Sequence, residues 1–284
     1  MGVKDIGRGG KVSSGATGAG QMSNIEVGYV NVFESATVLV TSAAAGYPGY
    51  RLYDRFLGKM WQATGVEDQI ISADQGGGVP QAVDTLAIPA GHNLAGATLY
   101  LEYSSDNIKW FKPPGVPSWG QPDNNLIFKQ MSAPQSYRFW RFRIVGPSVA
   151  PMVGEIFLTL LYAFSPGAQP SITTSSTYGN ERNVIRNRPK SGLVQFLLCG
   201  NPARFRTYFL EQCNDADLAV LQALDSAWQG TLPFLFIDHA GAVFFAELLA
   251  DTASAGTDEG LRYLVFSPKE TWTAVQLQVL EVTG

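Results

Sequence analysis

The regular alternation of short apolar runs with turn residues most constrains what this chain can fold into. Val83–Ile88 and residues 97–103 are rich in Val, Leu, Ile, Thr and Tyr, whereas residues 89–94 carry Pro, Gly and Asn. Apolar runs bounded by such residues are typical of strands joined by an ordered loop. We therefore predict a hairpin-like unit over residues 83–110, around which the first half of the chain is organised.

Residues 137–145 form the clearest single strand of the sequence. Trp140 and Phe142 fall on one face, and Arg141 and Arg143 fall on the other, because successive side chains of a strand point to opposite sides of its sheet. Short strands separated by turns, without a long helical period between them, predict a β-sandwich.

The chain divides into four parts by composition. Residues 1–25 are rich in Gly and Ser and predict a flexible N-terminal arm. The β-sandwich is expected over residues 26–163. Residues 164–183, rich in Ser, Pro, Gly and Thr, predict a linker. Residues 184–284 predict a second, mainly β domain.

One helix is expected in this second domain. Asn214 can cap a helix over residues 215–229, and Asp215 and Asp217 lie in the first turn, where negative charge is favoured. Gly230 ends the pattern. We predict that this helix packs on the surrounding strands.

Composition limits the classes of function. The 284 residues are 15% charged with a net charge of −4, so no overall positive field favours nucleic acid. No apolar run approaches the roughly 20 residues of a membrane-spanning helix, and the start lacks the apolar core of a signal peptide. We expect no membrane span, no nucleic-acid sequence recognition and no export. The low charge fraction fits either a large β core or a surface covered by partner molecules.

No catalytic motif is apparent. His92 and His239 are the two histidines; they fall in different predicted domains, and no serine elbow accompanies either one. The glycine runs lack the spacing of phosphate-binding loops. Cys199 and Cys213 have no CxxC or Cys/His cluster around them, so we expect reduced thiols, although a disulfide stays open. The sequence predicts a protein without enzyme activity, cofactor or metal.

Two groups of side chains suggest surface contacts. Arginines on the strand at residues 137–145 and a basic segment predict a subunit interface; the alternatives are a sandwich face and a solvated linker. Two tryptophans in irregular loops suggest sugar stacking, although loop aromatics also cap sandwich cores. The interface candidates are Arg141, Arg143, Arg182, Arg186, Arg188 and Lys190, and the sugar-contact candidates are Trp110 and Trp119.

The order of several motifs resembles a known family. They are YPGYRLYD at 47–54, WQA at 61–63, VDTLAI at 83–88 with GHNL at 91–94, YSSDN at 103–107, WRFRI at 140–144 and GEIFL at 154–158. Together they resemble the discoidin-type, galactose-binding-like jelly-roll sandwich, in the version found in tail proteins of tailed bacteriophages. YDRFLG at 53–58 replaces the family's usual Asn-Ala-Leu-Asp-Gly-Asp stretch, so we carry over no calcium or ligand residue.

The second half is similar to the tube-like β domain of distal tail and minor tail proteins. The motifs are RNRPKSG at 186–192, the expected helix, and GTLPFLFID at 230–238. This resemblance implies a virion protein of the tail tip or baseplate, assembled in the host cytoplasm. It would form a homo-oligomeric ring, expected to be a hexamer, that joins the tail tube to the hub or fibres.

The alternative function is a carbohydrate-binding module that contacts the host cell surface. A third possibility, a glycosidase accessory or enzyme domain, lacks a convincing pair of acids near an aromatic cleft.

Overall fold

The computed structural model describes residues 24–165, 177–181, 184–187, 195–198, 203–228, 232–248, 261–264 and 273–282. Residues 1–23 of the expected arm lie outside these ranges. The described residues are mainly strand, which confirms the predicted fold class. No helix among them is long and apolar enough to cross a membrane.

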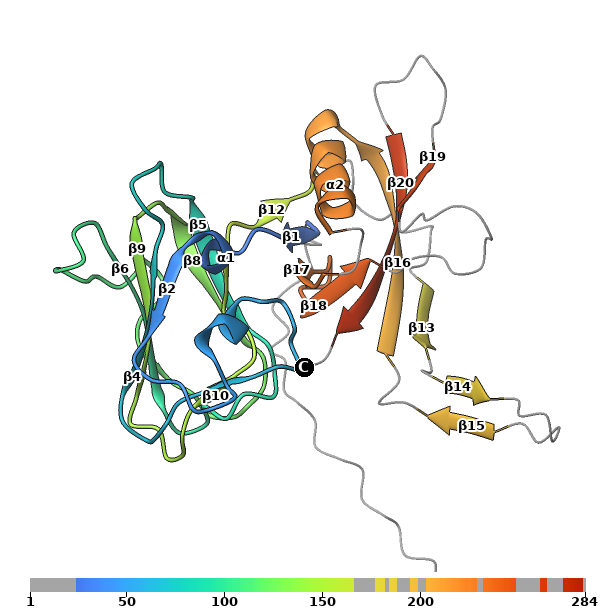
Figure 1. Cartoon of the computed structure of the whole chain (residues 1–284). Helices are drawn as coiled ribbons and strands as arrows, with labels where there is room; N and C mark the ends of the chain where they lie inside the picture. Colours follow the sequence, from blue (N-terminus) through green and yellow to red (C-terminus); the bar gives the residue numbers. More distant parts are fainter. Residues whose placement is uncertain are drawn as a thin grey trace, which may run out of the picture.

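A β-sandwich occupies the first half of the chain, as predicted (Figure 1). Its larger sheet has five strands in the order β2 (Thr37–Val40), β4 (Gln69–Asp74), β9 (Phe139–Val145), β6 (Thr98–Ser104) and β7 (Trp119–Gly120). The smaller sheet has three strands in the order β11 (Phe157–Thr159), β5 (Val83–Ile88) and β8 (Ile127–Gln135). A further pair joins β3 (Trp61–Gln62) to β10 (Met152–Val153).

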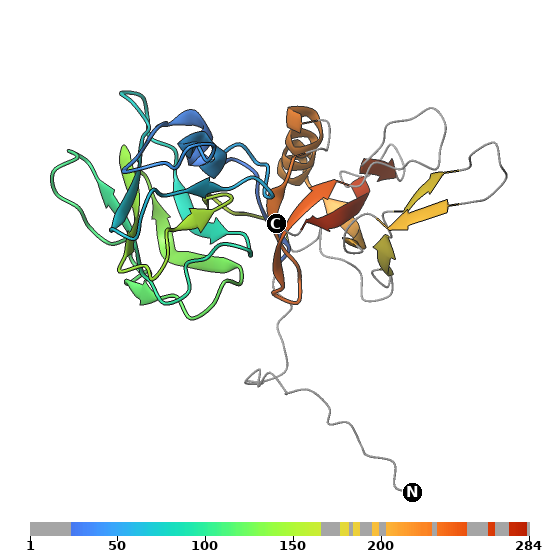
Figure 2. The same ribbon diagram turned by 60° about the horizontal axis from the view of Figure 1, so that its bottom comes forward.

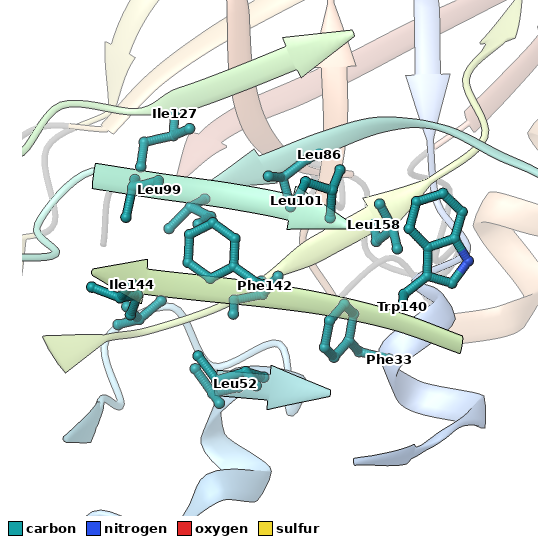
Figure 3. Packing of buried hydrophobic residues seen from close by; sticks show 14 of the residues in the cluster. Phe33, Leu52, Leu86, Leu99, Leu101, Ile127, Trp140, Phe142, Ile144 and Leu158 are labelled. Atoms are coloured by element: carbon teal, nitrogen blue, oxygen red, sulfur yellow. The ribbon is translucent and has the colours of Figure 1, made fainter. Parts of the chain in front are cut away.

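The sandwich core lies between the two sheets, where large apolar side chains meet (Figure 3). Trp140, Phe142 and Ile144 of β9 are fully buried there, as their alternation predicts. Phe33 joins the same core from the four-residue helix α1 (Val32–Ser35), which sequence periodicity did not indicate. A short 3-10 helix, η1 (Gly49–Leu52), contributes Leu52.

The predicted hairpin of residues 83–110 is wrong in its pairing. Both strands exist, but β5 pairs with β8 and β11, whereas β6 pairs with β9 and β7. The connection between them crosses from one sheet to the other, with Gly91 and Gly96 at positive φ. A connection of this length does not impose the tight turn that makes adjacent strands pair.

The second half contains an eight-stranded sheet. Its path runs β12 (Tyr162–Ala163), β1 (Glu26–Gly28), β17 (Phe234–Ile237), β18 (Val243–Leu248), β20 (Thr273–Val282), β16 (Ala203–Cys213) and β13 (Thr177–Glu181), with β19 (Leu261–Leu264) paired to β20. The hairpin of β14 (Val184–Asn187) and β15 (Gln195–Leu198) projects away from this sheet.

Three strands of this sheet lie outside the boundaries expected from the sequence. β1 and β12, which we assigned to the sandwich, hydrogen-bond in this sheet, and β1 joins it to β17. β13 falls within the expected linker and pairs with β16. Ile25, the last residue of the expected arm, is fully buried in the same unit. These segments are short, and their pairing in this sheet depends on backbone hydrogen bonds that any sequence can make.

The predicted helix is confirmed as α2 (Asp215–Trp228). The Asn214 side chain accepts a hydrogen bond from the Asp217 N–H at 2.9 Å, and Asp217 accepts one from the Asn214 N–H at 3.0 Å. This reciprocal cap satisfies donors at the helix start. Leu221 and Leu224 are buried against the sheet core, and Cys213, just before the helix, is a buried free thiol.

The two halves pack face to face. Ala87 and Phe157 point outward from the three-stranded sheet and form a cluster with Leu235 and Phe245 of the eight-stranded sheet. The rings of Phe157 and Phe245 meet edge-on with centroids 5.7 Å apart. The outer surface of the three-stranded sheet is therefore covered by the second half, which lies beside the sandwich (Figure 2). Among the described residues, the five-stranded sheet takes no part in this contact.

Candidate binding face

The outer face of the five-stranded sheet carries a cluster of charged and aromatic side chains. Because β6 reads TLYLEYS, alternate residues point away from the core: Leu99 and Leu101 are buried inward, while Tyr100 and Glu102 lie on the outer face. On β9, Arg143 is directly opposite Tyr100, and Arg141 is directly opposite Glu102. Strand register thus places two cations beside one carboxylate. We call Tyr100, Glu102, Trp110, Lys112, Arg141 and Arg143 the outer-face cluster.

Glu102 holds both arginines. Its Oε2 accepts a hydrogen bond from Arg141 Nε at 2.6 Å, and Arg143 Nε forms an ion pair with the same oxygen at 3.1 Å. The Glu102 side chain is 9% exposed, against 19% for Arg141 and 30% for Arg143. A partly buried ion pair keeps more of its attraction than a solvated one, because water and salt screen it less.

Two aromatic rings pack against the two guanidinium groups. Arg141 lies over the Trp110 ring at 4.0 Å, and Arg143 lies over the Tyr100 ring at 4.5 Å. Lys112 also faces Tyr100, with Nζ 5.3 Å from the ring centroid. Each cation–π contact adds about 0.5–1 kcal/mol at an exposed site and orients the cation.

A short ordered loop brings Trp110 to this position. Asp106 accepts hydrogen bonds from the Ile108 and Lys109 N–H groups, both at 2.9 Å, and these contacts hold the pKa of its carboxyl below the ordinary value. The chain then pairs back on β6 through Phe111 and Tyr103, whose N–H and carbonyl groups exchange two hydrogen bonds. The backbone on both sides of Trp110 is therefore held by hydrogen bonds.

The structure separates the two tryptophans proposed from the sequence. Trp119 on β7 is in register with the buried Leu99 and packs on Phe142 of the core, with ring centroids 6.4 Å apart. Lys129 lies over its ring at 5.0 Å. Trp119 thus faces the opposite side of the sheet from Trp110, and only Trp110 belongs to the outer-face cluster.

The predicted interface arginines also divide. Arg141 and Arg143 make contacts within their own chain, to Glu102. Arg186 lies on β14, whose backbone alone is described, and Arg182, Arg188 and Lys190 lie outside the described residues.

Three members of the cluster were not singled out from the sequence. Tyr100, Glu102 and Lys112 carry no motif, but the alternation of residues 98–104 would have shown that Tyr100 and Glu102 share a face. Their pairing with Arg143 and Arg141 depends on strand register, which the single sequence does not reveal.

His92 is a turn residue whose two ring nitrogens are both hydrogen-bonded. Its Nδ1 accepts the Leu94 N–H at 3.2 Å, so the other nitrogen carries the proton, and Nε2 donates to the Asn125 carbonyl at 2.8 Å. Burial lowers the pKa of this imidazole. His92 therefore joins two loops at one end of the sandwich. Within the described residues, no group of three or more His, Cys, Asp or Glu side chains is placed to hold a metal ion.

Comparison with solved structures gives similarity over less than half of the chain. No protein-family model and no curated protein sequence matches the chain. Among solved structures, it is similar to a chitosan-binding module of a chitosanase/glucanase from Paenibacillus sp. IK-5, with 16% identity, a TM-score of 0.39, and coverage of 46% of this chain and 98% of the module.

Two further structures show the same extent of similarity. The protein CpGH89CBM32-6 from Clostridium perfringens is 20% identical, with 47% of this chain and 99% of that chain covered and a TM-score of 0.39. A putative alpha-L-fucosidase from Bacteroides thetaiotaomicron is 18% identical, with 46% of this chain and 28% of that chain covered and the same TM-score. These values are too low to transfer a ligand or an activity, so the function is argued from the residues of this chain.

Proposed function

We propose that this protein binds carbohydrate, without catalysis, through the outer-face cluster. The observation that carries the proposal is the contact of Trp110 with Arg141, which pairs with Glu102 beside Arg143 on the outer face of the five-stranded sheet. A sugar ring has an apolar C–H surface and a rim of hydroxyl groups. An indole ring packs against the C–H surface, and planar carboxylate and guanidinium groups form hydrogen bonds with the hydroxyl groups.

Several atoms of the cluster are available for a ligand. Among the described residues, Arg141 is the one cation or ring in contact with the Trp110 indole, and no hydrogen bond from its Nε1 to a described side chain or carbonyl is present. The half-exposed ring thus offers an edge and a donor to a molecule lying on the sheet. The cluster is fixed by strand register and ring contacts, so little conformational freedom is lost on binding.

A panel of immobilised polysaccharides and oligosaccharides tests this proposal. We expect saturable binding by the full chain, weakened roughly tenfold or more by Trp110→Ala, as is typical when an aromatic anchor is removed. Tyr50→Ala is the matched control, because Tyr50 is an aromatic residue of the same sandwich, 55% exposed and outside the cluster. Absence of binding across the panel, or equal losses in both variants, would refute the proposal.

We propose second that the C-terminal unit anchors the sandwich in a larger assembly, in line with the resemblance to tail-tip proteins. Supporting it is the joint between the halves: β1 and β12 enter the eight-stranded sheet, and Arg55 of the sandwich donates a hydrogen bond to the Pro233 carbonyl of the second half. Such a joint would present the binding face at a fixed angle to a ring of identical subunits, expected to be a hexamer at a phage tail tip.

Light scattering coupled to size-exclusion chromatography tests the assembly proposal. A discrete oligomer, expected to be a hexamer, supports the ring. A monomer at concentrations up to the millimolar range would contradict it while leaving carbohydrate binding in place.

A further inference from the structure

The outer-face cluster holds two guanidinium groups with their outer nitrogens unused. Arg141 and Arg143 are both fixed through Nε to the same oxygen of Glu102. Within the described part of the chain, the Nη atoms of these two arginines make no hydrogen bond to protein. Each group therefore presents its terminal N–H donors in a defined orientation, held by Glu102 on one side and by an aromatic ring on another.

The local charge is positive although the chain as a whole is negative. Arg141 and Arg143 share the single carboxylate of Glu102, and Lys112 lies near Tyr100 of the same cluster, whereas the net charge of the chain is −4. The nearby Asp74 does not change this balance, because Arg138 forms two hydrogen bonds to its carboxylate, at 2.7 and 2.9 Å. The cluster thus keeps an excess of cations on the face where Trp110 lies.

Paired guanidinium groups with free N–H donors recognise planar or tetrahedral anions. Arginine forms two parallel hydrogen bonds with a carboxylate, sulfate or phosphate, a geometry that the point charge of a lysine cannot match. Here Glu102 accepts a hydrogen bond from Arg141 Nε and forms an ion pair with Arg143, whose Nε makes no hydrogen bond. Within the described residues, the fork formed by the Nη atoms of each arginine is unused. An anion placed above the two arginines would complete the hydrogen bonding of both.

The following inference rests on the proposed function. We propose that the ligand is an acidic saccharide, whose anionic group is bound by the Nη atoms of Arg141 and Arg143 while a sugar ring packs beside Trp110. The anion is a carboxylate, as in a uronic acid, or a sulfate ester. Both sources share the chemistry that the two guanidinium groups recognise, and the ligands in the test distinguish them.

Matched pairs of polymers test the inference with the full chain. The probes are polygalacturonate against its methyl ester, and dextran sulfate against dextran, with affinity measured by titration calorimetry at 150 mM salt. We expect the charged member of at least one pair to bind tenfold or more tightly than its neutral partner. The pair that shows this preference identifies the anion as carboxylate or sulfate.

Two conservative variants separate bidentate recognition from general attraction. Arg141→Lys and Arg143→Lys keep the charge but lose the fork, so each should remove most of the preference for the charged polymer. Lys109→Gln removes one exposed positive charge from the neighbouring loop and should leave the preference within twofold. Thermal melting checks that each variant is folded.

Each outcome bears on one of the two claims. Equal or tighter binding of the neutral partners, a preference unchanged in both lysine variants, or binding to none of the four polymers would overturn the acidic-saccharide inference. Carbohydrate binding itself would still stand if neutral members of the wider panel bound in a Trp110-dependent way. Loss of all saccharide binding across that panel would overturn the proposed function instead.

Discussion

Arg55 of the sandwich donates a 2.9 Å hydrogen bond from Nη1 to the carbonyl of Pro233 in the second half of the chain. Its Nη2 donates to the Tyr29 carbonyl at 2.6 Å, and the guanidinium pairs with Glu34. The same group lies 4.9 Å from the centroid of the Phe157 ring, at the apolar contact between the halves. One arginine therefore links the sandwich, the connecting segment and the eight-stranded sheet.

Arg55→Ala should destabilise the chain and uncouple its halves. Removing one partner of a buried ion pair costs about 3 kcal/mol, because it leaves the other partner and two carbonyl groups without their donor. Calorimetry should show a lower melting temperature and two unfolding transitions in place of one. Arg51→Ala is the matched control, since Arg51 donates to the Met60 carbonyl within the sandwich. A single unchanged transition in Arg55→Ala would show that the joint contributes little.

Glu155 supports the same joint from inside the sandwich. It is fully buried, and it accepts hydrogen bonds from the Asn31 side chain at 2.9 Å and from the Arg55 N–H at 3.0 Å. Burial nevertheless raises the pKa of its carboxyl well above the ordinary value. Arg55 itself has a positive φ of 61°, so the hydrogen bond from its backbone holds an unfavoured conformation in place.

Gly154→Ala should lower stability because the added methyl group has no room. A Cβ at this position would lie 2.6 Å from the Leu57 carbonyl oxygen, which belongs to the backbone and cannot swing aside. Overpacking of this kind costs about 1–3 kcal/mol. Gly77→Ala is the control, since a Cβ there meets nothing within 4 Å. In urea unfolding, the midpoint of Gly154→Ala should be lower than that of Gly77→Ala. Equal midpoints would mean that the backbone around residue 57 moves to accommodate the methyl group at little cost.

The acid stability of the sandwich should depend on His92. Its pKa is lowered by burial from 6.5, so the folded state binds this proton less readily than the unfolded state. The stabilisation is present above pH 6.5 and is lost as the pH falls through the folded pKa. Between pH 7.5 and 5 the melting temperature of the native chain should fall more than that of His92→Gln. Parallel curves of melting temperature against pH for the two proteins would show that protonation of His92 does not affect stability.

The sequence predicted single elements better than their partners. The alternation in β9 correctly assigned Trp140 and Phe142 to the core and Arg141 and Arg143 to the opposite face, since a strand has a period of two. The helix start at Asn214 was also correct, because capping is a local interaction. The pairing of β5 with β8, and of β1 with β17, depends on backbone hydrogen bonds that no side-chain pattern encodes.

The candidate site was predicted only in fragments. Trp110 was proposed for sugar contact and Arg141 and Arg143 for a subunit interface, as unrelated features. Their meeting requires the register of β6 against β9, and a return of the chain after the Asp106 turn. Glu102 gave no signal, because a carboxylate on a strand is ordinarily a solvated residue; its role follows from the two arginines opposite and diagonal to it.

The most direct test of the binding face is the response of the tryptophan indole N–H resonances to added saccharide. Trp110 Nε1 has no hydrogen-bond acceptor among the described residues, whereas Trp140 is fully buried in the core and serves as an internal reference. With Trp110→Phe used for assignment, we predict that a bound saccharide shifts the Trp110 signal and leaves that of Trp140 unchanged. An unchanged Trp110 signal under saturating ligand, with shifts confined to residues outside the outer-face cluster, would contradict the account.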